Sequence, residues 1–144
     1  TTPNLRALQK HAIKCGGGYN HRYGLDDAIL IKDNHIAICG GIGPAMERAK
    51  ACVGHTMKIE IEVDSIAQLK EALPFAPDVV LLDNFTIEQF AEAVKLAKGK
   101  AILEASGGVN LQTVRAIAET GVDVISIGAL THSAPNFDIG LDAV

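Results

Sequence analysis

Short apolar runs recur along the chain at nearly even intervals, and this spacing constrains the fold more than any other feature. The runs that begin at residues 57, 79, 101 and 124 start 22, 22 and 23 residues apart. Amphipathic stretches fill the intervals between them. Strands that alternate with helices in this way form parallel sheets joined by right-handed crossovers. The sequence therefore predicts an α/β fold with a parallel sheet.

Five apolar runs are predicted to be strands, at residues 28–31, 57–63, 79–82, 101–103 and 124–127. Helix starts are marked by capping residues and prolines, at Thr2-Pro3, Pro44, Ser65, Thr86 and Asn110. A short extended segment is also expected at residues 138–143. A barrel and an open doubly wound sheet both fit this periodicity. The lack of a G-x-G-x-x-G turn, and polar residues gathered at the strand ends, favour the barrel.

Composition excludes several classes of protein. The 144 residues carry a net charge of −4, only 4% are aromatic and none is Trp, which argues against nucleic acid as a partner. No apolar run approaches the roughly 18 residues of a membrane span. The three cysteines form no C-x-x-C pair, so each is interpreted as a small buried hydrophobe in a reducing compartment. We expect a cytoplasmic protein that binds neither nucleic acid nor membrane.

One predicted strand carries charges on a single face. Lys58, Glu60 and Glu62 alternate with apolar residues and therefore point to the same side. A half-exposed edge strand with a solvated face would explain this pattern without a function. In a barrel, however, that face is the interior, where ionised groups need partners or a ligand. Asp83 ends the next strand, and carboxylates at neighbouring strand ends suit a cationic transition state, ribose hydroxyls or a divalent metal.

Glycine-rich turns follow the last two predicted strands. The first contains Ser106, Gly107 and Gly108, and the second contains Gly128. Backbone N–H groups in such turns can approach an anion closely, and paired turns on the last strands of barrels often bind phosphate. Tight turns without a ligand remain the alternative for either segment alone. We interpret the pair as a candidate phosphate site.

Basic side chains flank the first predicted strand. His21 and Arg22 follow three consecutive glycines, and Lys32 follows the strand itself. Arginine offers a planar fork for a carboxylate and lysine a point charge, so these residues could bind an acidic ligand. A single histidine is as often structural as functional, and both interpretations of His21 stay open on this pattern alone.

These motifs together resemble the quinolinate phosphoribosyltransferase family, also called decarboxylating nicotinate-nucleotide pyrophosphorylase. The matching segments occur in the family's order and span almost the whole chain: CGGGYNHRYGLDD, LIKDNH, IEIEV, LLDNF, LEASGG, GVD and IGALTHS. The resemblance implies a barrel domain with about seven parallel strands. It also implies Mg²⁺ as cofactor and a homo-oligomeric protein.

The implied reaction joins the pyridine nitrogen of quinolinate to C1 of phosphoribosyl pyrophosphate. Pyrophosphate and CO₂ leave, and nicotinate mononucleotide forms for NAD biosynthesis. By this resemblance, His21, Arg22 and Lys32 hold the quinolinate carboxylates, and Glu62 and Asp83 lie near the ribose and metal. Lys32, Glu62 and Asp83 are thereby the candidate catalytic residues. The phosphate-binding residues implied by the resemblance are Ser106, Gly107, Gly108 and Gly128.

The chain departs from the family's pattern at its start. Family members have an N-terminal domain and a first barrel strand that leads into Thr-Arg-Lys-Thr, whereas this sequence opens at Thr1-Thr2-Pro3. We therefore expect residues 1–144 to be most of the barrel domain, weakly stable and inactive alone. The alternatives are a related enzyme for another aromatic acid, or an inactive barrel fragment with a structural or interaction role.

Overall fold

The structure, a computed structural model, describes residues 1–133 and divides into two compact units. The larger unit is His21–Ile127, and the smaller unit combines Thr1–Asn20 with the described residues from Gly128 onward. The extended segment expected at residues 138–143 lies outside the described residues.

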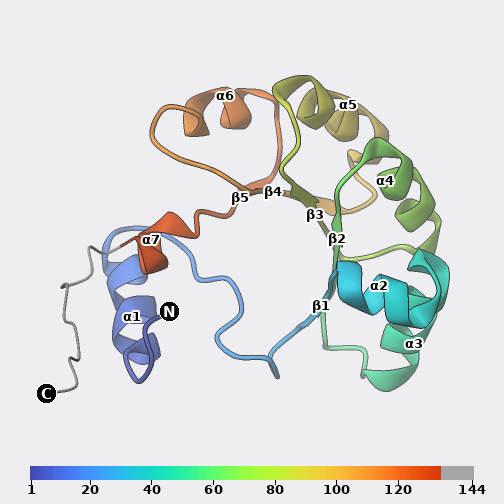
Figure 1. The fold of residues 1–144 in the computed structure, drawn as a ribbon, viewed down its shortest axis with the longest axis horizontal. Helices are drawn as coiled ribbons and strands as arrows, with labels where there is room; N and C mark the ends of the chain where they lie inside the picture. Colours follow the sequence, from blue (N-terminus) through green and yellow to red (C-terminus); the bar gives the residue numbers. More distant parts are fainter. Residues whose placement is uncertain (134–144) are drawn as a thin grey trace, which may run out of the picture. The chain divides into compact units, whose positions relative to one another are not determined.

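The larger unit is built on a parallel sheet. Within residues 21–127 the sheet has five strands in the order β1-β2-β3-β4-β5, so each strand pairs with its neighbours in sequence (Figure 1). The strands are β1 Ile29–Ile31, β2 Ile59–Val63, β3 Val79–Asp83, β4 Ile102–Ser106 and β5 Val124–Ile125. All five predicted strands are confirmed. Strands β3 and β4 extend further than predicted because their polar last residues continue the pairing.

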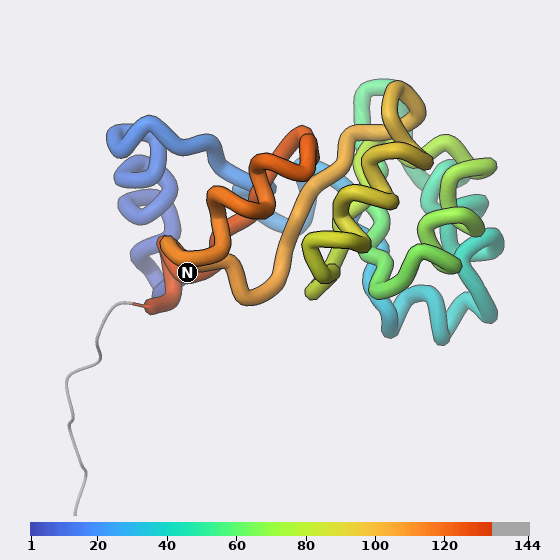
Figure 2. The backbone as a smooth tube through the Cα atoms, turned by 90° about the horizontal axis from the view of Figure 1, so that it is seen from above, coloured from blue at the N-terminus to red at the C-terminus, as the bar shows by residue number. Residues whose placement is uncertain are grey.

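Helices connect the strands of this unit. They are α2 Asp33–Cys39, α3 Ile42–Cys52, α4 Ile66–Ala72, α5 Ile87–Ala97 and α6 Val114–Glu119, with a 3₁₀ turn at Leu73–Phe75. Figure 1 shows α3, α4, α5 and α6 on one side of the sheet. In Figure 2, α3, α4 and α5 run as neighbouring coils, from teal through green to olive.

Two helix starts follow the predicted caps. The hydroxyl of Thr86 accepts a hydrogen bond from the N–H of Gln89, whose side chain accepts from the N–H of Thr86, which completes a capping box. The hydroxyl of Ser65 accepts from the N–H of Gln68 in the same manner. These local hydrogen bonds satisfy N–H groups that have no partner within the helix.

Two other helix starts were predicted wrongly. Helix α3 begins at Ile42, two residues before Pro44, and the proline fits because the N–H groups of the first turn need no helical acceptor. Helix α6 begins at Val114, because the side chain of Asn110 accepts hydrogen bonds within a preceding turn, including one from the N–H of Thr113.

Helix α2 was not predicted. It follows β1 directly, and its first turn is closed by a hydrogen bond of 2.9 Å from the N–H of Lys32 to Nδ1 of His35. Lys32 stands at the N-cap, and His35 takes the place of the Glu or Gln of a capping box, so the sequence carries no recognisable cap.

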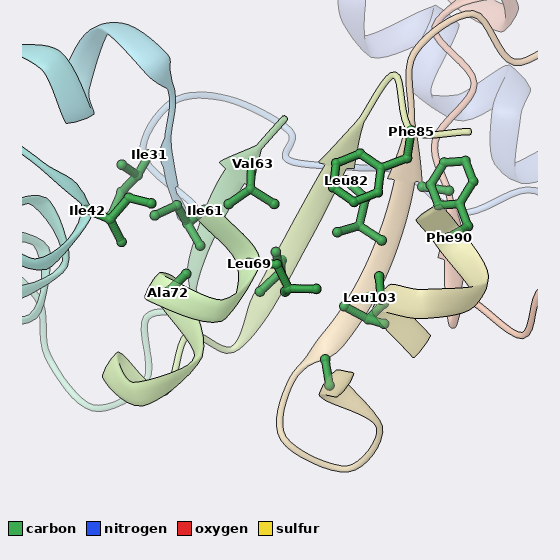
Figure 3. Packing of buried hydrophobic residues seen from close by; sticks show 14 of the residues in the cluster. Ile31, Ile42, Ile61, Val63, Leu69, Ala72, Leu82, Phe85, Phe90 and Leu103 are labelled. Atoms are coloured by element: carbon green, nitrogen blue, oxygen red, sulfur yellow. The ribbon is translucent and has the colours of Figure 1, made fainter. Parts of the chain in front are cut away.

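The hydrophobic core lies between the sheet and the helices. Ile61, Val63, Leu82 and Leu103 point from β2, β3 and β4 toward the buried faces of α4 and α5 (Figure 3). Phe90 of α5 is 2% exposed, and its ring centroid lies 5.8 Å from that of Phe85. Truncation of such a side chain to alanine typically costs about 2–5 kcal/mol, so this face maintains the fold.

Two aspartates join strand beginnings at the end of the sheet opposite the candidate site. The carboxylate of Asp78 accepts the N–H of Ile59 at 3.0 Å, and the N–H of Asp78 donates to the carbonyl of Ile59. Asp123 repeats both contacts with Leu103, and its carboxylate accepts the Leu103 N–H at 2.8 Å. Each aspartate therefore satisfies both backbone groups of a residue in the first two positions of the preceding parallel strand.

The smaller unit contains α1 Arg6–Cys15 and α7 Ala129–His132. The predicted start of the first helix at Thr2-Pro3 is wrong, because α1 begins at Arg6. Thr2 instead forms two hydrogen bonds with the side chain of Gln9. The Gln9 side chain further donates to the carbonyl of Thr131, which links the two helices. Helix α7 was not predicted.

Two further expectations concern the whole described chain. Its three cysteines are free thiols, as expected, but Cys15 and Cys52 are exposed, so their interpretation as buried hydrophobes is wrong. Within residues 1–133 no helix is long and apolar enough to cross a membrane.

Candidate active site

Strand register brings the candidate polar residues to one face of the sheet. Glu62 pairs with Leu81, so Asp83 follows two residues further along the adjacent strand on the same face. Leu81 and Asp83 pair in turn with Glu104 and Ser106. The intervening residues form the apolar face that packs against the helices. The sidedness predicted for the strand at 57–63 is confirmed for Glu60 and Glu62.

Lys58 does not belong to this polar group. It precedes β2, is largely exposed and pairs with Asp78, with 2.5 Å between Nζ and Oδ1. The prediction that Lys58 faces inward with Glu60 and Glu62 is therefore wrong. Its long, flexible side chain pairs with Asp78 at the end of the strands opposite the candidate site.

Lys32 and Glu62 form an ion pair where β1 and β2 end. Their Nζ and Oε2 atoms are 2.9 Å apart, and the Glu62 side chain is 18% exposed against 50% for Lys32. The backbone of Lys32 is fixed by its hydrogen bond to His35, so the lysine is attached to the start of α2 rather than to a loose loop. A ligand that reaches this edge meets both a cation and a carboxylate.

Asp83 ends β3 beside a tight turn. Asn84 adopts a positive φ of 55° and donates from Nδ2 to Oδ2 of Asp83 at 2.8 Å. The N–H of Asn84 donates to the carbonyl of Ser106 on the neighbouring strand. Asn84 therefore orients the candidate catalytic carboxylate, a role the sequence analysis missed although the residue lies in the LLDNF motif.

The glycine turn after β4 packs directly against Asn84. Gly107 has a φ of +90°, and a Cβ placed there would lie 2.2 Å from Oδ1 of Asn84. Gly108 also has a positive φ, of +60°, but space around it is open. The close approach to Asn84 explains the need for glycine at 107, so this feature does not by itself require a phosphate.

His21 enters the same polar face from the segment before β1. Its Nε2 lies 3.0 Å from Oε2 of Glu60 and 3.7 Å from Oε1 of Glu104. The hydroxyl of Ser126 donates to that same oxygen of Glu104. Both glutamates are buried, and the sequence analysis assigned a role to neither. Both glutamates alternate with apolar residues along their strands, and this pattern could have indicated that they lie on the polar face. From this pattern only Glu62 was predicted to be a site residue.

The electrostatics of this cluster follow from burial and pairing. The hydrogen bond with Glu60 is the main cause that raises the pKa of His21; burial opposes it, and the charges of Glu60 and Glu104 reinforce it. Burial is the main cause that raises the pKa of Glu104, although the Ser126 hydrogen bond acts against it. The pairing with Glu60 therefore favours the protonated form of the imidazole.

The same three residues are a possible metal-ligand set. Among the described residues, donor atoms of His21, Glu60 and Glu104 all lie within 4.8 Å of one another. The 3.0 Å contact has the length of an N–H···O hydrogen bond, and Ser126 already donates to Glu104. Hydrogen bonding accounts for this arrangement without an ion.

Arg22 and Gly128 occupy different surroundings. The Nη1 of Arg22 donates to the carbonyl of Ala28 at 3.3 Å, which ties its guanidinium to the residue just before β1. Gly128 belongs to the smaller unit, where its carbonyl accepts the N–H of Thr131 at the start of α7. Its φ of −59° is ordinary, and an added Cβ would lie 2.5 Å from Nε2 of His132.

The larger unit thus collects most of the predicted site residues on one side of its sheet and at the ends of the strands. It contains His21, Arg22, Lys32, Glu62, Asp83, Ser106, Gly107 and Gly108. Contacts join Lys32 to Glu62, and Asp83 to the glycine turn through Asn84. Gly128 is described separately, within the smaller unit.

Comparison with known proteins agrees with the pattern of motifs. Residues 1–142 match the family described as quinolinate phosphoribosyl transferase, C-terminal domain. A probable nicotinate-nucleotide pyrophosphorylase [carboxylating] from Bacillus subtilis is 46% identical over 99% of this chain and 49% of its own length. A nicotinate-nucleotide pyrophosphorylase from Mycobacterium leprae is 47% identical over 99% of this chain and 51% of its own length.

A solved structure shows the same relationship. The nicotinate-nucleotide pyrophosphorylase from Ehrlichia chaffeensis is 49% identical and superposes with a TM-score of 0.89, over 99% of this chain and 52% of that one. The chain spans about half the length of the curated relatives it matches. The chain belongs to the quinolinate phosphoribosyl transferase family and corresponds to its C-terminal domain.

Proposed function

We propose that the protein containing this chain transfers a phosphoribosyl group from phosphoribosyl pyrophosphate to the ring nitrogen of quinolinate. Decarboxylation then gives nicotinate mononucleotide, with pyrophosphate and CO₂ as the other products. Family membership supports this reaction class. The observation that carries it is the Lys32–Glu62 pair on the same polar face as Asp83, because one edge then offers a cation and two carboxylates.

The carboxylates suit the bond that breaks. As pyrophosphate departs from C1, positive charge develops on the ribose, as it does in glycoside hydrolysis. Glu62 and Asp83 would stabilise that charge from fixed positions on adjacent strands. Such catalysis needs no covalent nucleophile, because positioning and electrostatics lower the barrier.

The basic residues suit the acid substrate. Quinolinate carries two carboxylates, and His21, Arg22 and Lys32 all belong to the larger unit that carries the polar face. The raised pKa of His21, caused mainly by its hydrogen bond with Glu60, favours the cationic form that would bind an anion. The turn of Ser106, Gly107 and Gly108, within the larger unit, would receive the phosphate of the ribose.

Mg²⁺ is the proposed cofactor. Glu62 and Asp83 supply the hard oxygen ligands that this ion prefers, so the residues present fit it. When bound, Mg²⁺ would neutralise charge on the departing diphosphate. Lys32 would compete for Glu62 in that state, since the two side chains are already paired.

We also propose how the chain fits into the whole protein. In the described residues β1 pairs with β2 alone and β5 with β4 alone, so each has a free edge. Further strands of the intact protein would close a barrel of about seven strands on these edges. An additional N-terminal domain, a homo-oligomeric assembly and a cytoplasmic location complete the proposal, and residues 1–144 alone would be inactive.

The test is an assay of the intact protein with quinolinate, phosphoribosyl pyrophosphate and Mg²⁺. Formation of nicotinate mononucleotide together with CO₂ is expected. Efficient reaction with nicotinate and none with quinolinate would instead support the related enzyme for another aromatic acid. Failure to bind either substrate would support a structural or interaction role.

A further inference from the structure

The feature that carries a further inference is a buried acidic pair around His21. Glu60 and Glu104 reach the imidazole from two strands, β2 and β4, while His21 itself precedes β1. Each glutamate side chain is only 8% exposed, against 33% for the histidine. Buried carboxylates are costly unless something compensates them, so this arrangement calls for an explanation.

We propose that Glu60 and Glu104 are positioning residues that hold the His21 imidazole, as a cation of fixed orientation, for a carboxylate of the substrate. This inference rests on the proposed function and adds two residues to it. Glu60 contacts His21 directly at 3.0 Å, and Glu104 is held at 3.7 Å by its hydrogen bond from Ser126.

The burial of Glu60 supports this assignment. Its Oε2 meets His21, while its Oε1 is buried and makes no hydrogen bond to any described residue. When one oxygen of a buried, ionised carboxylate has no hydrogen bond, the stability of that charge depends strongly on a positive group at the second oxygen. The dependence is mutual, because a positive imidazole is what makes Glu60 tolerable in this position. Glu60 therefore acts through His21 and needs no contact with the substrate.

The charges around the imidazole determine whether an anion could bind there. The charged groups that act on the pKa of His21 include Glu60 from β2, Glu104 from β4 and Arg22 beside it in sequence. If both glutamates were ionised, their two negative charges would cancel those of the imidazolium and of Arg22, and no positive charge would remain for a dicarboxylate. Burial, with the charge of Glu60, raises the pKa of Glu104 and so favours its neutral form. With Glu104 neutral, the imidazolium balances Glu60, and the charge of Arg22 remains to attract an anion.

The first experiment measures His21 without any ligand. The intact protein is labelled with ¹³C-histidine, the His21 resonance is assigned from its loss in His21→Asn, and its titration is followed by NMR. Glu60→Gln keeps the shape and an acceptor oxygen but removes the charge. We expect the pKa of His21 to fall, whereas Glu92→Gln, which alters an exposed glutamate paired with Lys70 on another face, should leave it in place. An unchanged His21 titration in Glu60→Gln would overturn the proposal.

The second experiment measures quinolinate binding by calorimetry at several pH values. If the pKa of His21 falls by one unit, the dissociation constant at pH above both values should rise about tenfold in Glu60→Gln. The loss should shrink as the pH is lowered, because the imidazole then regains its proton. Affinity for phosphoribosyl pyrophosphate should stay as in the wild type. An equal loss of quinolinate affinity at every pH would contradict the role of charge.

Variants of Glu104 separate positioning from simple packing. Glu104→Ala should weaken quinolinate binding, and Glu104→Gln should restore most of it, because an amide resembles a protonated carboxyl in shape and charge. No rescue by glutamine would overturn the neutral state assigned to Glu104. Tight binding of Zn²⁺ or Mn²⁺ that Glu60→Gln abolishes would also overturn the proposal, since the cluster would then be a metal site. If the wild type fails to bind quinolinate, the proposed function fails, while the NMR titration still tests the cluster.

Discussion

Lys32 and Glu62 are bonded across the ends of two neighbouring strands, with 2.9 Å between the ammonium nitrogen and the carboxylate oxygen. The pair joins a group proposed to bind the acid substrate to a group proposed to act on the sugar. An arriving carboxylate would compete with Glu62 for the ammonium. Binding of the acid would thereby leave Glu62 available to the developing positive charge at C1.

Glu62→Gln in the intact protein should lower turnover while preserving the fold. The substitution removes the charge with little change in volume, and loss of one preorganised electrostatic contact costs about 100-fold or more in rate. Steady-state kinetics with both substrates would measure the effect. Glu92→Gln, on the exposed face of α5, is the matched control. Wild-type turnover in Glu62→Gln would remove this carboxylate from the mechanism.

Arg22→Lys should weaken quinolinate binding by roughly 1.5–3 kcal/mol, because a planar fork that forms charge-assisted hydrogen bonds is replaced by a point charge. The lysine would also lose the guanidinium contact with the carbonyl of Ala28. Calorimetric titration with quinolinate gives the dissociation constant directly. Affinity equal to that of the wild type would exclude Arg22 as a carboxylate ligand.

Gly107→Ala should destabilise the protein more than Gly108→Ala. Both positions have positive φ, which costs a non-glycine residue about 1–2 kcal/mol. Only at Gly107 would the new Cβ collide with Asn84, at 2.2 Å from Oδ1 and 2.8 Å from the backbone nitrogen. Urea unfolding compares the two variants.

The same pair of variants tests the proposed phosphate turn. If the turn binds phosphate, Gly107→Ala should also raise the dissociation constant of phosphoribosyl pyrophosphate more than that of quinolinate. Equal stability of the two alanine variants would show that Asn84 moves aside without cost. An equal effect on both ligands would indicate a general loss of structure at this edge.

Asp123→Ala should lower the free energy of unfolding by about 1–3 kcal/mol, because the N–H of Leu103 loses its acceptor where Leu103 is buried. Asp123→Asn keeps an acceptor oxygen and should lose much less. Chemical denaturation of both variants gives the comparison. The prediction fails if alanine and asparagine at this position are equally stable.

Asp78 should contribute to stability in a pH-dependent way. Burial alone would raise the pKa of its carboxyl, but hydrogen bonds from Lys58 and the Ile59 N–H outweigh burial and hold the pKa below its ordinary value. A lowered folded-state pKa stabilises the protein above the unfolded value of about 3.9, and this stabilisation disappears as the pH falls through the folded value. Asp78→Asn should therefore be less stable than the wild type at neutral pH and equal to it in acid, as thermal unfolding at both pH values would show.

The sheet was predictable because its signals are local and repeated. The apolar runs, and caps such as Thr86, each act within a few residues of the chain. The missed helix α2 lacks such a signal, since His35 closes its first turn through a ring nitrogen. The start of α6 was predicted too early because Asn110 caps a turn that precedes the helix. A capped turn and a capped helix use the same local hydrogen bonds, so the sequence does not distinguish them.

The site was predictable only in part, because its central contacts join distant segments. His21 and Glu60 are 39 residues apart in the sequence, and Ser126 is 22 residues from Glu104. Alternation along β2 places Glu60 on the polar face but cannot show which residue faces it across the sheet. The role of Asn84 likewise depends on the approach of Gly107 from the next strand.

The two faces of the strands separate two kinds of inherited change. In β2, Ile59, Ile61 and Val63 face the helices, while Glu60 and Glu62 lie between them on the other side. A mutation at one of the apolar positions should lower the amount of protein in the cell. Substitution of Glu62 by glutamine, which changes little volume, should leave that amount nearly unchanged and act on the proposed function instead. Under the proposed function, alternate residues of one strand could therefore change the acid that is bound without repacking the interior.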